Sequence, residues 1–131
     1  MKTFTNFIFL LTFLLSLSLY SQKTIWLDID LKETNKINSV YYKVISDDKN
    51  KENYFYKSGN IFRKLNYSKR RPIDNFAEFY ETGELKTSGK FENGLKEGIW
   101  KIYYRNGKIK EKGKYKNGDK VGIWKSYYKN F

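Results

Sequence analysis

The sequence has no cysteine and no histidine among its 131 residues. Without thiols it can form no disulfide, carry no lipid on an acylated cysteine and use no thiolate nucleophile. Without imidazole it lacks the most common general base and one of the principal zinc ligands. We therefore expect no catalytic residue, no metal ligand set and no cofactor, and packing of the chain alone must stabilise the fold.

Few acidic side chains are spaced for chemistry. Asp28 and Asp30 flank Ile29 on a predicted strand, so they share one face and could form a carboxylate pair or bind a hard cation. The alternation favours a solvent-facing position for both instead. Asp47 and Asp48 lie in a predicted turn without the ligand spacing of a calcium loop, and no glycine-rich phosphate-binding pattern ends in Gly-Lys-Ser/Thr. These absences argue against an enzyme.

Acidic residues are also too few to balance the basic ones, and the formal net charge is +12. From residue 84 onward, 13 Lys and Arg stand against 5 Asp and Glu, so most of the excess lies there. A solvated surface that resists aggregation explains such an excess, and so does a cationic surface for an anionic partner. Beyond Ser21 no apolar period of the helical kind persists, which predicts no long helix.

The N-terminal segment 1–21 differs from the rest of the chain. Lys2 precedes an apolar run at positions 7–20, which is shorter than the roughly 20 residues that span a bilayer. This length favours a cleaved signal peptide over a membrane anchor. We therefore expect residues 1–21 to be removed near Ser21 and Gln22, and the protein to be exported to the periplasm, the cell surface or the medium.

One sequence phrase recurs from Phe76 onward at a fixed step, which is the separation of Phe76 from Trp100. Large rings stand at Phe76, Trp100 and Trp124, and a pair of aromatic residues follows in each unit. A fixed period of this length indicates stacked repeats, in which one unit alone cannot bury its apolar face. We expect repeats at 76–99 and 100–123, a partial repeat at 124–131, a degenerate repeat at 52–75, and an N-terminal β cap at 22–51 with strands at 25–31 and 40–45.

Each repeat has the sequence of a β-hairpin. Asn-Gly pairs at 106–107 and 117–118 predict type I′ turns between antiparallel strands. We expect two-residue loops at 106–107 and at 82–83. The register that follows places Tyr104 opposite Ile109, Trp100 opposite Gly113, Tyr80 opposite Leu85 and Phe76 opposite Gly89. The predicted fold is all-β, an antiparallel meander of stacked β-hairpin repeats after the signal peptide.

A large ring therefore stands opposite a glycine in both full repeats. A ring that packs on a glycine compensates for the side chain that the glycine lacks. The alternative is that Gly89 and Gly113 mark bulges in their strands. In the degenerate repeat Glu52 replaces the ring and Leu65 replaces the glycine, as expected if ring and glycine pack on each other. A basic turn at 69–72 replaces the Asn-Gly turn there.

Alternation along the strands predicts one aromatic face and one wet face. The aromatic face forms the structural core of the repeats, with Phe76, Tyr80, Gly89, Phe91, Trp100, Tyr104, Gly113, Tyr115, Trp124 and Tyr128. Lysines recur on the opposite face, where they cannot be buried unpaired. They are the candidate contacts for an anionic partner: Lys101, Lys108, Lys110, Lys112, Lys114 and Lys116.

The phrase GIWKIYYRNGKIKEKGKYKNGDKVGIW resembles the bacterial MORN-repeat-variant proteins, often labelled YwqK-type antitoxins, and the resemblance covers residues 52–131. It implies an elongated meander of hairpins that serves as an interaction platform, with no catalytic residues to carry over. The antitoxin label implies a protein that binds and neutralises a partner toxin. The MORN class has also been associated with lipid headgroups, for which the lysine face is suited.

Three functional hypotheses follow. The leading one is a protein-interaction or structural module of the cell envelope. The second is an antitoxin or immunity-like binder of one toxin, and the third is a binder of anionic lipid headgroups or cell-wall polymers. Tyr103 among lysines resembles a nucleic-acid surface, but the export signal and the absence of any nucleic-acid-binding motif argue against that partner.

Overall fold

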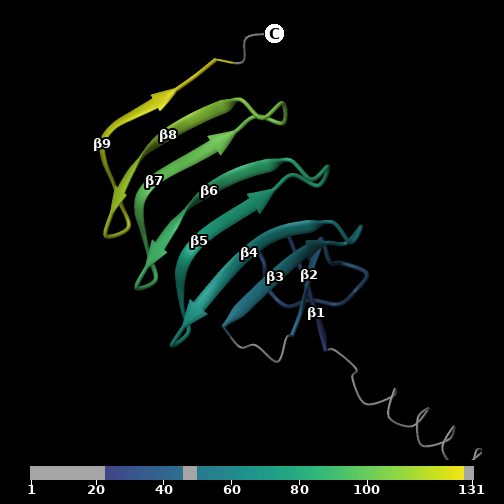
Figure 1. Cartoon of the computed structure of the whole chain (residues 1–131). Coiled ribbons are helices and arrows are strands. Elements are labelled where there is room, and N and C mark those ends of the chain that lie inside the picture. The colour runs from purple at the N-terminus through teal and green to yellow at the C-terminus, as the bar shows by residue number, and fades with distance from the viewer. Residues whose placement is uncertain (1–22, 46–49, 129–131) are drawn as a thin grey trace, which may run out of the picture.

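The computed structural model describes residues 23–45 and 50–128, so the predicted signal peptide and the Asp47–Asp48 turn lie outside the described residues. Within these ranges every regular element is a strand, and all strands pair antiparallel in chain order in a single open sheet (Figure 1). The strands are β1 Thr24–Leu27, β2 Tyr41–Val44, β3 Lys51–Tyr56, β4 Ile61–Ser68, β5 Arg71–Phe79, β6 Leu85–Glu92, β7 Leu95–Tyr103, β8 Ile109–Lys116 and β9 Asp119–Ser126. The predicted all-β meander is confirmed. No helix in the described ranges is long and apolar enough to span a membrane.

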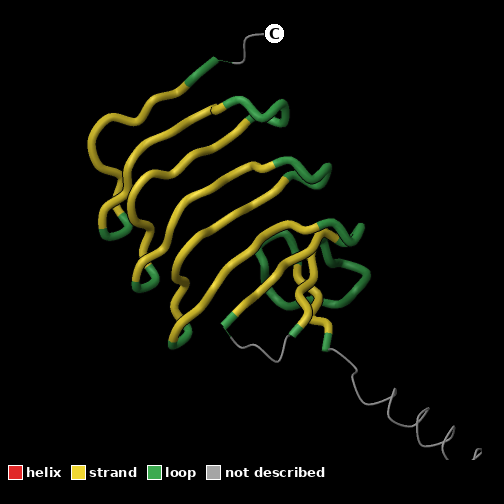
Figure 2. Tube along the Cα trace, in the orientation of Figure 1, coloured by secondary structure: helices red, strands yellow, loops and turns green. Residues whose placement is uncertain are grey.

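The hairpins stack in register, and their turns gather along two opposite sides of the sheet (Figure 2). From β4 onward the long strands bend, so the sheet is curved (Figure 1). The strand ladder also contains bulges. At one of them a single residue of β6, Gly89, stands against the segment 98–100 of β7. Extra residues in one strand of a pair bend that strand and increase its twist.

Turns on one side are two-residue loops, as predicted for the Asn-Gly pair at 117–118. Asn117 and Gly118 have φ angles of 51° and 91°, both in the left-handed region that a type I′ turn requires. Asn93 and Gly94 have the same conformation. In the degenerate repeat the basic turn also has it, since Lys69 and Arg70 both have positive φ. The hairpin geometry is thus retained without the residues that favour it.

Turns on the other side differ from the prediction. Only Gly107 of the 106–107 pair has positive φ. The Tyr104 N–H donates to the Lys108 carbonyl and the Gly107 N–H donates to the Tyr104 carbonyl, both at 2.9 Å. The loop therefore has three residues, 105–107, and ends in a glycine bulge. The same two hydrogen bonds recur in the turns that contain Gly83 and Gly59.

The longer loop changes the predicted register near the turn. Ile109 pairs with Tyr103 instead of Tyr104, and Leu85 pairs with Phe79 instead of Tyr80. Farther from the turn the register is as predicted, because the bulge absorbs the extra residue before the pairing resumes. Trp100 is opposite Gly113 and Phe76 is opposite Gly89.

The predicted strand at 25–31 is shorter than expected, since β1 ends at Leu27. Oδ1 of Asp28 accepts hydrogen bonds from the N–H groups of Asp30 and Lys32, at 2.9 and 3.0 Å, and Leu31 has a φ of 62°. An aspartate that bonds to nearby backbone N–H groups favours a turn over a strand. Asp28 and Asp30 are therefore not neighbours on one face of a strand, and the carboxylate pair considered above is wrong.

Two buried clusters of described residues hold the sheet together. The first lies at the N-terminal end and centres on Leu27, Tyr41 and Phe62. The second centres on Leu65, Phe76 and Trp100, with partly buried rings packed around it. The first cluster joins β1 and β2 to the degenerate repeat, and the second runs through the repeats themselves.

Candidate functional site

One face of the repeats carries a continuous ladder of aromatic rings. Its ring centroids are separated by 5.6 Å for Phe76–Phe91, 5.2 Å for Phe91–Trp100, 5.7 Å for Trp100–Tyr115 and 5.1 Å for Tyr115–Trp124. Edge-to-face contacts at such distances stabilise beyond simple burial. Trp100 at the centre is only 3% exposed. This ladder contains half of the predicted core residues, namely Phe76, Phe91, Trp100, Tyr115 and Trp124.

Trp100 and Trp124 each cover a glycine, but it is not the glycine that the predicted register places opposite the ring. A Cβ at position 113 would lie 2.2 Å from Cδ2 of Trp124, the ring of the following strand, and the ring over Gly89 is Trp100. The ring thus packs on the glycine of the preceding repeat instead of the glycine opposite it. Both glycines also lie at a register shift with the following strand, so the bulge interpretation holds as well.

The degenerate repeat must be explained differently as a result. Glu52 does pair with Leu65, yet the large residue that clusters with Leu65 is Phe76 of the next repeat. A phenylalanine is smaller than a tryptophan, and it meets a leucine where the later repeats have a glycine. The two volumes compensate each other, so the ring and glycine were not lost together as the sequence suggested.

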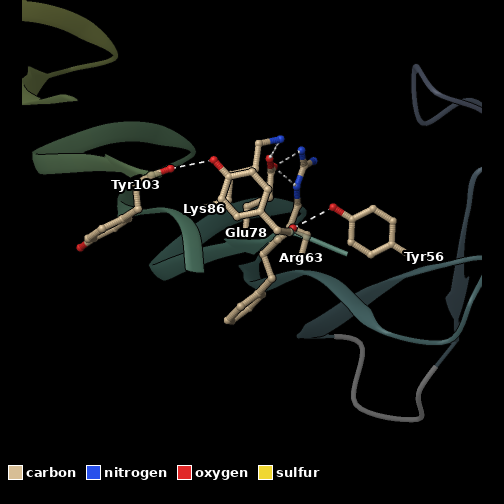
Figure 3. A network of polar contacts seen from close by, with 7 residues as sticks. Tyr56, Arg63, Glu78, Lys86 and Tyr103 are labelled. Atoms are coloured by element: carbon tan, nitrogen blue, oxygen red, sulfur yellow. Dashed lines mark hydrogen bonds and ion pairs between the residues drawn. The ribbon is translucent and has the colours of Figure 1, made fainter. Parts of the chain in front are cut away.

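A second ladder links successive hairpins through tyrosine hydroxyls. Tyr56 donates to the Phe79 carbonyl at 2.8 Å, Tyr80 to the Tyr103 carbonyl at 2.7 Å, and Tyr104 to the Tyr127 carbonyl at 2.8 Å. Figure 3 shows the first two of these bonds on either side of Glu78. The sequence carried a signal for them, since this position is tyrosine in every repeat whereas the preceding aromatic position is Phe or Tyr. Tyr128, predicted to lie in the core, is 93% exposed.

The acidic groups between these strands have structural partners. Glu78 forms ion pairs with Arg63 at 2.8 Å and Lys86 at 3.0 Å (Figure 3). Burial, followed by a hydrogen bond to Glu52, raises the pKa of Tyr54 far above its ordinary value. Burial also raises the pKa of Tyr56 to about 12. Within residues 23–45 and 50–128, no three or more Asp or Glu side chains are grouped to hold a metal ion.

The opposite face of the repeats forms a groove of about 780 Å³. Backbone at Gly89, Gly113 and Gly122 contributes to its lining, together with Ile99 and Ile123. We call it the lysine groove, after its basic residues Lys90, Lys101, Lys112, Lys114 and Lys125. Successive residues of a strand point to opposite faces, so Lys101 and Trp100 lie on opposite sides of the sheet.

Three lysines stand side by side in this groove. Lys101 pairs directly with Lys112 across β7 and β8, and Lys112 pairs with Lys125 across β8 and β9. Adjacent strands are about 4.8 Å apart, and like charges directly opposite each other destabilise a sheet. None of the three forms an ion pair with a described residue; Lys112 lies 5.9 Å from the centroid of the Tyr127 ring. The strand register thus places three lysines that have no acidic partner among the described residues in one row across the sheet.

The predicted anionic-partner face is only partly brought together. Lys101, Lys112 and Lys114 line the groove, whereas the other three lysines do not. Lys108 follows the 105–107 loop, Nζ of Lys110 lies 5.8 Å from the Tyr104 ring centroid, and Lys116 stands opposite Asp119 in the strand ladder. The prediction missed Lys90 and Lys125, although they occupy the same repeat positions as the predicted Lys114 and Lys101.

Comparison with known proteins yields a match between one repeat and a family model. A model described as MORN repeat variant matches residues 96–117, which cover most of the β7–β8 hairpin. This match supports the MORN-repeat part of the resemblance. No curated protein matches the chain, and no solved structure matches it.

Proposed function

We propose that the chain is a non-enzymatic interaction module that binds an anionic partner in the lysine groove. A MORN repeat is itself consistent with a structural or interaction role. The observation that carries the proposal is the row of Lys101, Lys112 and Lys125, which stand opposite one another without acidic partners among the described residues. An anion in the groove would relieve their mutual repulsion.

The rest of the groove is suited to holding such a partner. Ile99 and Ile123 are 56% and 81% exposed, so apolar contact surface lies among the ammonium groups. A surface whose only task is solubility has no need of exposed isoleucines at two equivalent positions. Contacts made mainly by surface charge weaken as salt is added, because mobile ions screen them.

The predicted signal peptide would place this surface outside the cytoplasm. Anionic lipid headgroups and cell-wall polymers are then the available partners, which makes the protein an envelope module. Subcellular fractionation of the native host tests this localisation. Recovery of the protein only from the cytosol would remove these partners while leaving the groove intact.

Vesicle sedimentation tests the anion-binding proposal directly. The protein should sediment with vesicles that contain phosphatidylglycerol and not with pure phosphatidylcholine, and added salt should release it. A variant with Lys101→Gln, Lys112→Gln and Lys125→Gln should lose this binding. The matched control changes Lys108, Lys110 and Lys116 to Gln. It removes the same charge from outside the groove and should retain most of the vesicle binding. Equal loss in both variants would show that net charge alone is responsible.

A second candidate is a binder of one protein, as the antitoxin label of the resembling proteins implies. The exposed Ile99 and Ile123 favour it, since aliphatic side chains surrounded by polar groups are typical of protein interfaces. Pull-down of the exported protein from its native host should then yield one stoichiometric protein, encoded by a neighbouring toxin gene. Retention of that partner by the groove triple variant would exclude the groove as its binding site.

A further inference from the structure

We infer that the lysine groove binds a linear acidic polysaccharide whose chain runs across the strands, with one acidic group for each sequence repeat. This inference rests on the proposed function, because it names the ligand of the same groove. The inference is based on a set of lining residues that occurs twice along the groove.

The groove is built from two equivalent sets of residues. Lys90, Ile99 and Lys101 form the first set, and their counterparts one repeat later, Lys114, Ile123 and Lys125, form the second. Equivalent residues lie two strands apart, which corresponds to about 9.5 Å at the usual strand spacing. A site that repeats by translation along its length binds best to a ligand that repeats in the same way.

The spacing and chemistry favour a polysaccharide. Two linked pyranose rings in an extended chain advance by a similar distance, so a polymer with one acid per disaccharide presents its carboxylates in step with the lysine sets. The C–H face of a sugar ring offers an apolar surface for Ile99 and Ile123. Lysine supplies the point charges that such a ligand needs, and the described lining contains no arginine to form a bidentate contact.

Other polyanions fit less well. Phosphates of duplex nucleic acid recur about every 3.4 Å along each strand, and single strands bind through stacked bases. Phe76, the one aromatic residue of the described lining, is only 9% exposed, so it offers no stacking platform. An extended peptide gains affinity by pairing with a free sheet edge. Among the strands that line this groove only β9 has such an edge, so a ligand that crosses β6, β7 and β8 meets strands that are already paired on both sides.

Fragments of hyaluronan, which carry one carboxylate per disaccharide, provide the probe. Calorimetry or fluorescence titration of the purified protein should show that the tetrasaccharide binds about tenfold or more tightly than the disaccharide, because the second set is engaged at high effective concentration. The hexasaccharide should bind only slightly more tightly than the tetrasaccharide, since the groove has only two equivalent sets of residues. Neutral chitin fragments of equal length serve as the control ligand.

Two single variants sharpen the test. In Lys125→Gln the tetrasaccharide should lose its advantage while the disaccharide still binds at the first set. Lys108→Gln, with the same change of charge outside the groove, should leave the advantage intact. Both variants alter exposed side chains, and circular dichroism unchanged from wild type would confirm that they fold.

Several outcomes would overturn the inference. Affinity independent of chain length would do so, and so would equal binding of oligothymidylate or polyglutamate of matched charge; the proposed anion-binding function would survive either result. Binding to anionic vesicles with no binding to any hyaluronan fragment would also overturn it and spare the proposed function. Failure to bind both vesicles and every polyanion would overturn the two together.

Discussion

The indole ring of Trp100 occupies the space in which a side chain at Gly89 would stand. A Cβ at position 89 would lie 2.2 Å from Cδ2 and 2.3 Å from Cε2 of that ring. The indole is rigid and buried, so it cannot give way as the end of a lysine could. Two residues on neighbouring strands therefore fix how one hairpin packs on the next.

Gly89→Ala is expected to destabilise the protein by about 1–3 kcal/mol, because the added methyl group overpacks a filled site. Gly113→Val, beneath Trp124, should act in the same way. Thermal unfolding followed by circular dichroism measures both. A rescue test copies the degenerate repeat: Gly89→Leu combined with Trp100→Phe should be more stable than Gly89→Leu alone, as Leu65 and Phe76 are accommodated together. Unchanged melting temperatures would contradict this packing.

Trp100→Ala is expected to cost about 3–5 kcal/mol, since it removes a large buried ring. That ring contacts Phe76, Phe91 and Tyr115, and its Nε1 donates to the Lys90 carbonyl at 3.2 Å. Trp124→Ala should cost less, because that indole is half-buried and its Nε1 has no hydrogen-bond partner among the described residues. Denaturant unfolding measures the free energy of unfolding of each variant. A larger loss from Trp124 than from Trp100 would refute this ranking.

Tyr80→Phe should destabilise the protein by about 1 kcal/mol. The hydroxyl donates to the Tyr103 carbonyl, which lies at a bulge, so its removal leaves that acceptor without this bond. The matched control is Tyr128→Phe, in which the changed side chain is 93% exposed. Equal free energies of unfolding for wild type and Tyr80→Phe would show that the tyrosine ladder contributes nothing to stability.

Lys69→Asn combined with Arg70→Gly is expected to stabilise the protein. Both residues have positive φ, which costs a residue with a side chain about 1–2 kcal/mol relative to favourable conformations. Asn and Gly hold the same conformation in the other two turns of this side. The reverse exchange, Asn117→Lys with Gly118→Arg, should lower the melting temperature. A melting temperature that rises in both variants, or falls in both, would contradict the shared turn geometry.

Stability should decline in alkali through the buried tyrosines. Burial raises the pKa of Tyr56 from 10.0 to about 12, so the folded state holds a proton that the unfolded chain releases. Its contribution is intact below pH 10 and is lost as the pH rises towards 12. The pKa of Tyr54 and of Tyr67 is raised as well, mainly by burial. The free energy of unfolding, measured with denaturant across this pH window, should decline less steeply for Tyr56→Phe than for wild type, which isolates the contribution of this tyrosine.

The local sequence pattern was sufficient to predict the hairpins and their strand register away from the turns. Trp100 opposite Gly113 followed from the sequence because a short loop ties two adjacent segments together. The loop at 105–107 was missed because Asn-Gly occurs in two different tight turns, and the φ angles and the hydrogen bonds of Tyr104 in the folded chain distinguish them. Asp28 was misjudged for a similar reason, since its side chain competes with the strand for backbone N–H groups.

The sequence by itself determined the repeat period, the antiparallel meander and the alternation of side chains between the two faces, because each follows from side-chain spacing along one strand or across one short loop. Tertiary structure alone decided which ring covers which glycine. The bulge at Gly89 sets the segment 98–100 of β7 against a single residue of β6, and this slip brings Trp100 over the preceding repeat. A second register shift, between β8 and β9, pairs Lys125 with Lys112, which itself pairs with Lys101. The spacing of residues along a strand does not fix such a shift, because the shift depends on where the sheet bulges.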